Sequence, residues 1–238
     1  MTGTEEIQKQ ILKKFMYNKD LKYNEIWNKE IPSNKFNYHL QSLITRNIIE
    51  KKEETYRLTD TGIHVISSLD GVEISQKKKP ILCAFVMGYD EKENKILVNI
   101  RKKQPFLNYL GIPGGKVELG KTIEEQAKEE FLEETGLEGE LKLKLIMNLI
   151  TINEETNNAN HHVTGFFYLA TNLKGKLIEK NREGENLFLE QKECNKYPRY
   201  PDFDYFTTKL LDESKELIFK EAKRFVKDEE FTKIEFID

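Results

Sequence analysis

The stretch GGKVELGKTIEEQAKEEFLEETGL, residues 114–137, decides how the second part of this chain folds. It joins a Pro113-Gly114-Gly115 turn to a run that contains seven glutamates in twenty-four residues. At about 100° per residue, Ile123 and Ala127 lie on one face of a helix, as core residues do. The pattern therefore predicts a helix over 122–136 that follows directly on a glycine turn.

The glutamates of this helix do not all point toward solvent. Glu130 and Glu134 continue the face of the apolar residues, and Glu133 lies about 60° to one side of Glu130. Buried unpaired carboxylates are costly or become protonated, whereas a hard divalent cation such as Mg²⁺ or Mn²⁺ prefers carboxylate oxygens. The glycines of the Pro113-Gly114-Gly115 turn let bare backbone come close to them, so a backbone carbonyl of the turn can join the ligands. A solvated acidic helix, the alternative, does not explain glutamates in register with apolar residues.

The spacing of these residues resembles the Nudix box, G-x5-E-x7-R-E-U-x-E-E-x-G-U, in which U is a bulky aliphatic residue. Here the box begins at Gly115, runs through Lys121 and Glu129, and ends at Leu137. The flanking segments RKKQPFLNYLGIPGGKVELG and YPRYPDF are also typical of the family. The resemblance covers roughly residues 78–212.

The resemblance implies a pyrophosphohydrolase that uses Mg²⁺ or Mn²⁺ to cleave a nucleoside diphosphate linked to another moiety. Glu130, Glu133 and Glu134 match the catalytic, metal-binding glutamates, with help from the carbonyl of Gly115. Glu118 matches a glutamate often found in the loop. The substrate itself stays open, because base and sugar contacts come from variable loops.

The implied mechanism is attack of water on one phosphorus, with one glutamate taking the proton. The family places this base either in the box or in a later loop. The candidates are therefore Glu133, Glu134, Glu154, Glu155 and Glu185. Arg101, Lys102 and Lys103 end a strand before the site and are candidates for contacts with substrate phosphates, although a solvated strand end is the alternative.

Two positions depart from the family's box. Lys121 stands where the family has glutamate, and Glu129 stands where it has arginine, so the two charges are exchanged. A direct contact requires Lys121 to lie in the loop before the first turn and to reach across about 12 Å of helix rise. Two hypotheses follow: an active hydrolase, or a transcriptional regulator whose altered Nudix domain senses a nucleotide-type metabolite without turnover.

The first part of the chain has a different pattern. Apolar spacing predicts helices over 5–17, 22–31, 33–47 and 60–69, with Ser33 as the N-cap of the third and a hairpin over 48–59. Three helices, a hairpin and a helix make a small α+β winged helix-turn-helix domain. The run over 34–62 also resembles the recognition helix and wing of winged-helix transcriptional regulators. We expect domains at 1–76 and 77–238.

In such folds the third helix enters the major groove of DNA and the wing touches the backbone. Phe36, Leu40 and Leu43 are expected to face inward. The side chains left for DNA are Lys35, Asn37, Tyr38 and Gln41 on the helix and Arg57 on the wing. Winged helices also serve as dimerisation or protein-binding modules, so a homodimer is the alternative, and Glu50, Glu53 and Glu54 dilute the charge of the wing.

The second domain alternates strands and helices. We expect a hairpin over 81–101, further strands over 140–152, 161–170 and 185–191, helices over 201–214 and 213–228, and a final strand over 230–238. Strands interleaved with helices predict an α/β/α sandwich on a mixed sheet, the α/β class.

Composition places few limits on function. The chain has 238 residues, 38% hydrophobic and 33% charged, with a formal net charge of −3. No apolar run approaches the roughly 20 residues that span a bilayer, and the polar N-terminus lacks the apolar core of an export signal. Cys83 and Cys194 lie far apart without metal-site spacing. We expect a cytoplasmic protein with no membrane partner.

Overall fold

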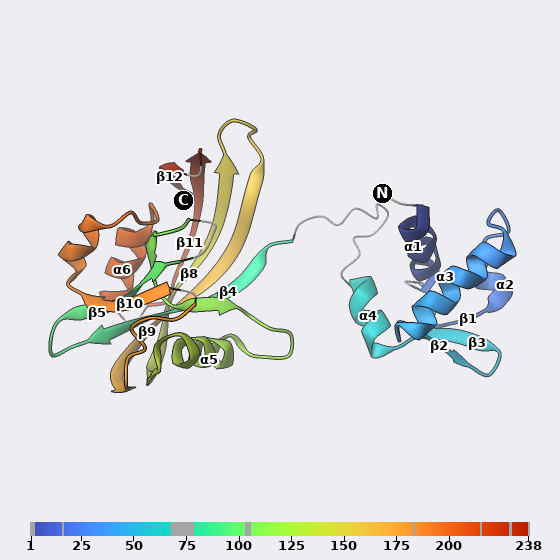
Figure 1. Ribbon diagram of the computed structural model, residues 1–238, viewed down its shortest axis with the longest axis horizontal. Coiled ribbons are helices and arrows are strands. Elements are labelled where there is room, and N and C mark those ends of the chain that lie inside the picture. The colour runs from blue at the N-terminus through green and yellow to red at the C-terminus, as the bar shows by residue number, and fades with distance from the viewer. Residues whose placement is uncertain are drawn as a thin grey trace. The chain divides into compact units, whose positions relative to one another are not determined.

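The computed structural model describes residues 3–15, 17–67, 79–102, 106–182, 184–214, 216–228 and 230–237. The chain forms two compact units, Met1–Lys78 and Lys79–Asp238 (Figure 1). The expected boundary between residues 76 and 77 falls outside the described residues. Within those residues, no helix is long and apolar enough to cross a membrane.

The first unit contains helices and a hairpin in the expected order. Its elements are α1 (Gly3–Phe15), β1 (Asp20–Lys22), α2 (Tyr23–Ile26), α3 (Ser33–Thr45), β2 (Ile49–Lys52), β3 (Thr55–Leu58) and α4 (Asp60–Ser67). The last two residues of the expected fourth helix lie outside the described residues. The short strand β1, which pairs with β3, was not expected, because three residues are too few to carry a pattern.

Two local expectations in this unit were wrong. The helix expected over 22–31 is a single turn, since the Trp27 indole donates to the carbonyl of Ile31 at 2.9 Å and Asn28 accepts from the amide of Glu30. Such local bonds compete with helical ones. Helix α3 begins at Ser33 itself, and Pro32, whose carbonyl accepts from the amide of Phe36, occupies the N-cap position.

One hydrophobic core holds the first unit together. Apolar side chains of α1 and α3 are buried in it, and four of them, Ile11, Phe36, Leu40 and Leu43, are at most 2% exposed. They occupy the positions that helical spacing predicts. The opposite face of α3 is therefore left to solvent.

The second unit is built on a mixed sheet. Its strands are β4 (Ile81–Asp90), β5 (Lys95–Arg101), β6 (Leu110–Gly111), β7 (Gly114–Lys116), β8 (Leu137–Asn153), β9 (Ala159–Gly175), β10 (Gly184–Leu189), β11 (Ile218–Lys227) and β12 (Glu230–Ile237). The order is β10-β5-β4-β9-β8-β11-β12, with β6 beside β5 and β7 beside β4. The pairs β4–β9 and β8–β11 are parallel and the others antiparallel, which confirms the expected mixed sheet and the hairpin over 81–101.

Two helices pack against opposite faces of this sheet (Figure 1). On β4, Ala84 and Val86 pack with α5 (Ile123–Thr135), whereas Met87 packs with the cluster of α6 (Phe203–Leu211). A 3-10 helix, η1 (Gln191–Lys196), precedes α6. This alternation along one strand produces two cores and holds α5 in a fixed position against the sheet.

The prediction of a helix over 213–228 is wrong, because residues 218–227 of this segment form strand β11, which is parallel to β8. Ala222, Arg224 and Val226 lie on the inward face of β11, and their spacing of two residues is that of a strand. The arginine at the middle position hides this alternation in the sequence. It can face inward because it pairs with the buried carboxylate of Asp202. The final strand, β12, pairs with β11.

Candidate active site

Helix α5 begins and ends at residues suited to those positions. Thr122 is the N-cap; its hydroxyl accepts from the amide of Glu125, whose carboxylate in turn accepts from the amide of Thr122. Gly136 ends the helix with φ of 70°, a left-handed conformation that glycine adopts readily. The helix bounds therefore fix where its glutamates lie.

The glutamates lie at the edge of the buried face of α5. Ala127, Phe131 and Thr135 are at most 1% exposed. Glu130 and Glu134 are half-buried beside them, whereas Glu133 is exposed. Glu130 and Glu134 thus continue the apolar face of the helix, as expected, but they lie at the border of the core and are only partly buried.

The glycine turn lies directly against this edge. The amide of Gly114 donates to the Glu134 carboxylate at 2.9 Å. A Cβ added to Gly115 would lie 2.3 Å from Oε1 of Glu130, so no larger residue fits there without displacing the carboxylate. Gly115 is held in place by β7, where it lies opposite Ala84 of β4. The structure therefore brings together three of the four predicted metal-site residues: Gly115, Glu130 and Glu134.

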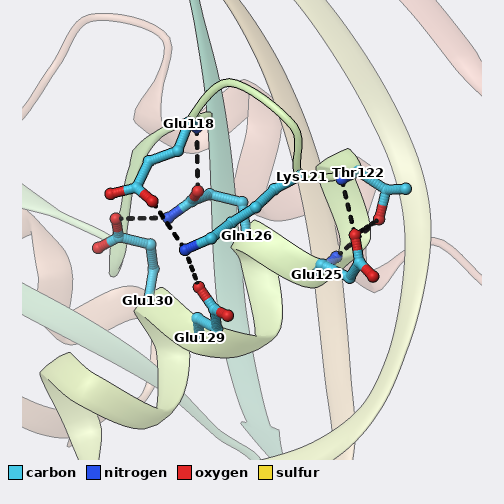
Figure 2. A network of polar contacts seen from close by, with 7 residues as sticks. All are labelled: Glu118, Lys121, Thr122, Glu125, Gln126, Glu129 and Glu130. Carbon is cyan, nitrogen blue, oxygen red and sulfur yellow. Dashed lines mark hydrogen bonds and ion pairs between the residues drawn. The ribbon is translucent and has the colours of Figure 1, made fainter.

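Gln126 is a residue of this site that sequence reasoning missed. It is 3% exposed, its amide nitrogen donates to Glu130 at 3.0 Å, and its oxygen accepts from the amide of Glu118 at 3.0 Å (Figure 2). The signal was available, because Gln126 precedes Glu130 by one helical turn. Gln126 fixes the orientation of the Glu130 carboxylate and ties the loop to the helix.

The Glu130 carboxyl has a raised pKa. Burial is the main cause; the hydrogen bond from Gln126 opposes it, and the nearby charges of Glu133 and Glu118 raise the pKa further. A bound cation would relieve this accumulation of negative charge.

Lys121 joins two carboxylates at the start of α5. Its ammonium group donates to Glu129 and lies 2.8 Å from the Glu118 carboxylate (Figure 2). These two hydrogen bonds, first that with Glu118 and then that with Glu129, raise the pKa of Lys121. Lys121 contacts Glu129, and it lies in the loop before the first helical turn, which is the condition that the sequence sets for such a contact.

The donor set suits a hard cation, although the described residues contain no group of three carboxylate, imidazole or thiol side chains already placed to hold one. Glu130, Glu133 and Glu134 offer carboxylate oxygens, and Gly115 offers bare backbone beside them. This is the ligand chemistry that Mg²⁺ and Mn²⁺ accept. To bind a cation, the Glu134 oxygen that accepts from the Gly114 amide would have to accept from that amide and bind the cation at once, or give up the hydrogen bond.

The remaining predicted residues are dispersed. Arg101, at the end of β5, lies near the Tyr200 phenol; burial raises the pKa of Tyr200, and the charge of Arg101 opposes that rise. Lys102 is exposed, and Lys103 lies outside the described residues. Glu118 is bonded to Lys121, as described above.

The candidate bases outside the box differ in position. Across the sheet, Gly115 is level with Ile146 of β8. Glu154 and Glu155 follow the end of β8, about 20 Å or more along that strand from Ile146. The structure does not bring them to the box. Glu185 is nearer, because its neighbour Asn186 donates to the carbonyl of Glu134 at 2.7 Å, but Glu185 itself lies 3.5 Å from the ammonium of Lys180.

The predicted DNA-contacting residues lie in the first unit. Lys35, Asn37, Tyr38 and Gln41 are all exposed on α3. Asn37 also accepts a hydrogen bond from the Tyr23 hydroxyl. Arg57 differs from these four, because its guanidinium is paired with Glu50 on the neighbouring strand.

Comparison with known proteins gives three findings. A family model described as the NUDIX domain matches residues 79–210. Over 52 residues the chain is 52% identical to an ADP-ribose pyrophosphatase of Methanocaldococcus jannaschii. The match covers 22% of this chain and 31% of the relative, so this chain spans about a third of the length of that relative. The solved structure of a mutator MutT protein from Bacillus halodurans is similar, with a TM-score of 0.54 and 20% identity, over 66% of this chain and 97% of that one.

Proposed function

The chain belongs to the Nudix family, and from this membership we propose that its second unit is a metal-dependent pyrophosphohydrolase for a nucleoside diphosphate linked to another moiety. ADP-ribose is the first substrate to test, since the relative with the local 52% identity is an ADP-ribose pyrophosphatase. The observation that carries the proposal is the close contact between the Glu130 carboxylate and the bare backbone of Gly115.

Nudix hydrolases generally use divalent metal ions. Glu130, Glu133, Glu134 and the carbonyl of Gly115 would hold Mg²⁺ or Mn²⁺, which when bound neutralises charge on the phosphate oxygens and lowers the pKa of water. Gln126 keeps the Glu130 carboxylate turned toward Gly115.

Glu133 is the proposed general base. It is exposed beside Glu130, whereas Glu134 already accepts from the amide of Gly114. Water attacks one phosphorus, its proton passes to Glu133, and the anhydride bond to the second phosphate breaks. Two phosphate monoesters leave, which for ADP-ribose are AMP and ribose 5-phosphate. Arg101 and Lys103 are the proposed contacts to the substrate phosphates.

The test is a product assay on the purified full chain with Mg²⁺ or Mn²⁺. ADP-ribose, nucleotide sugars, dinucleoside polyphosphates and nucleoside triphosphates would each be supplied, and chelator would be the control. Release of AMP and ribose 5-phosphate from ADP-ribose is the expected result. Absence of turnover on every substrate with both metals would contradict the proposal.

We also propose that the first unit is a winged helix-turn-helix module that binds DNA. The supporting observation is the exposed polar face of α3, where Asn37 and Gln41 have the amide groups that read adenine and Lys35 can meet a phosphate. A dimerisation role is the alternative, and DNA retention at low salt distinguishes the two. A cytoplasmic location is compatible with the buried free thiols of Cys83 and Cys194.

The exchanged charges of Lys121 and Glu129 support a second candidate function, in which the second unit senses a nucleotide-type metabolite without turnover and controls DNA binding. Under that hypothesis ADP-ribose would change the affinity for DNA and would be recovered intact. Product analysis after the binding experiment separates the two candidates.

A further inference from the structure

A cluster of aromatic rings lies beside the candidate active site and has no role in the chemistry above. Phe106 and Phe231 are stacked, with ring centroids 4.5 Å apart and planes 23° from parallel. Tyr109 and Tyr200 lie against both rings, at 5.5 to 5.8 Å. These four residues, which we name the aromatic cluster, come from three separate segments of the chain.

The aromatic cluster differs from the cores of the molecule in its exposure. All four rings are half-buried, whereas core rings such as Phe131 and Phe203 are at most 1% exposed. Part of the cluster is thus accessible at the surface, and aromatic side chains are what a flat heteroaromatic ring stacks on.

A buried ion pair lies against two of the rings. The Arg224 guanidinium is 5.0 Å from the Tyr200 centroid and 6.0 Å from that of Phe231, and it is paired with Asp202. The Asp202 side chain is completely buried, yet its Oδ1 has no hydrogen-bond partner within the described part of the chain, and the same holds for Nε of Arg224. Because both atoms are fully buried, the pair acts on the cluster from within: the Arg224 guanidinium holds the rings of Tyr200 and Phe231 by cation–π contact.

The chain connects this cluster directly to the glycine turn. Tyr200 packs on Gly111, whose added Cβ would lie 3.5 Å from its ring. Gly111 precedes Gly114 by three residues, at most about 10 Å of extended chain. A ribose and a diphosphate can bridge that interval, with the phosphates at the box and the base at the rings.

From this arrangement we infer that the aromatic cluster, held in place by Arg224 and Asp202, is the subsite for the base of the nucleotide. The base stacks on the accessible part of the aromatic cluster, and the ion pair holds the rings in place from within. This inference deepens the proposed function. Two of its residues, Arg224 and Phe231, lie on β11 and β12, beyond the residues 79–210 that match the family.

The test compares the binding of AMP with that of ribose 5-phosphate by titration calorimetry, with chelator present. Both ligands carry a ribose phosphate and differ in the base, so the ratio of their dissociation constants reports the base contact. We expect the full chain to bind AMP at least about tenfold more tightly, as stacking on aromatic side chains provides. A ratio near one would overturn the subsite.

Phe231→Ala should bring this ratio close to one. The matched control is Phe236→Ala, which removes the same side chain from the same strand, but from a ring that packs on Tyr205 outside the cluster. Phe236→Ala should keep the wild-type ratio. Phe231→Leu covers the case in which the alanine variant fails to fold, and a full wild-type ratio in a folded Phe231 variant would refute the assignment.

The outcomes also separate this inference from the proposed hydrolysis. Selective AMP binding in a chain that hydrolyses no substrate leaves the subsite standing and removes the proposed activity. Hydrolysis of ADP-ribose together with equal binding of AMP and ribose 5-phosphate supports the proposed activity and removes the subsite. In an active chain, Phe231→Ala is expected to raise KM about tenfold and leave kcat nearly unchanged, because stacking remote from the phosphorus acts on ground and transition state alike.

Discussion

The ammonium group of Lys121 donates to the carboxylate of Glu129 from the residue just before the N-cap of α5. Both residues have the charge opposite to that of the Nudix box, and the two positions remain oppositely charged after the exchange. Because Lys121 also meets Glu118, one cation holds the loop to the helix beside the candidate metal site (Figure 2).

The first prediction tests this exchange by a double-mutant cycle. Lys121→Glu alone places a third carboxylate beside Glu118 and Glu129 and should weaken Mn²⁺ binding and any turnover several-fold. Adding Glu129→Arg should recover most of the loss, because coupled residues depart from additivity. Lys128→Glu, which reverses an exposed pair with Glu124 on the same helix, is the control and should have little effect. Additive losses would show that the two substitutions are independent.

A second prediction follows from the raised pKa of Glu130, which is caused mainly by burial. Because its pKa is higher in the folded chain, the folded state binds more protons between the two pKa values. The free energy of unfolding therefore falls as pH rises through that window. Without metal, Glu130→Gln should melt at a higher temperature than the wild type at pH 7, and the difference should disappear below about pH 4, near the unfolded pKa of glutamate.

Glu124→Gln is the matched control for that measurement, because Glu124 is exposed on the same helix and paired with Lys128. It should not raise the melting temperature. Equal stability of Glu130→Gln and the wild type at pH 7 would mean that burial does not penalise the charged form.

The third prediction concerns the proposed chemistry. Glu133→Gln should lower kcat on the order of 10²-fold or more, the usual contribution of a general base. Glu134→Gln should also abolish turnover, yet it should keep the fold, since the glutamine oxygen can still accept from the Gly114 amide. Kinetics and circular dichroism on both variants decide this. Wild-type turnover in either would refute the assignment of that residue.

A fourth prediction addresses DNA binding by the first unit. Lys35→Ala should weaken binding and reduce the slope of log affinity against log salt by about 1, the value for one lost phosphate contact. Arg57→Ala should have a smaller effect, because Arg57 is already paired with Glu50. Lys19→Ala, an exposed lysine outside α3 and the hairpin, is the control. Salt-insensitive association would instead favour a protein-binding role.

The fifth prediction tests the buried pair of Asp202 and Arg224. Arg224→Met leaves the Asp202 carboxylate buried without a partner and should lower the free energy of unfolding by about 3–5 kcal/mol. The double variant Asp202→Asn with Arg224→Met removes both charges and should lose clearly less. Urea denaturation measures both. A double variant that loses the sum of two independent effects would show that the pair is not coupled.

The sequence was sufficient where local patterns carry the information. Helix α5 and its start at Thr122 follow from the spacing of residues along one helix, and the same spacing states where Lys121 must lie if it is to contact Glu129. The hairpin of β4 and β5 follows from two β-prone runs on either side of a polar turn. These features depend on residues close together in the chain.

Features that depend on distant partners could not be predicted. The segment of β11 has a helical spacing of apolar residues, and its inward arginine makes sense only beside Asp202, 22 residues earlier. The anchoring of α5 by Asn186 joins residues 52 positions apart. The use of Gln126 to orient Glu130 was within reach of helical spacing, but glutamine has no charge to draw attention to it.

The parallel pairing of β11 with β8 has a consequence for the order of folding. Asn148 and Glu221, which are joined across these strands, are 73 residues apart in sequence. Loop closure of that length is slow, so the hairpin of β8 and β9 can form long before β11 reaches it. During this interval the edge of β8 exposes unpaired backbone groups between apolar side chains, the kind of edge on which other chains assemble. During synthesis on the ribosome, we therefore expect the edge of β8 to be open to association with other chains until β11 is made and pairs with it.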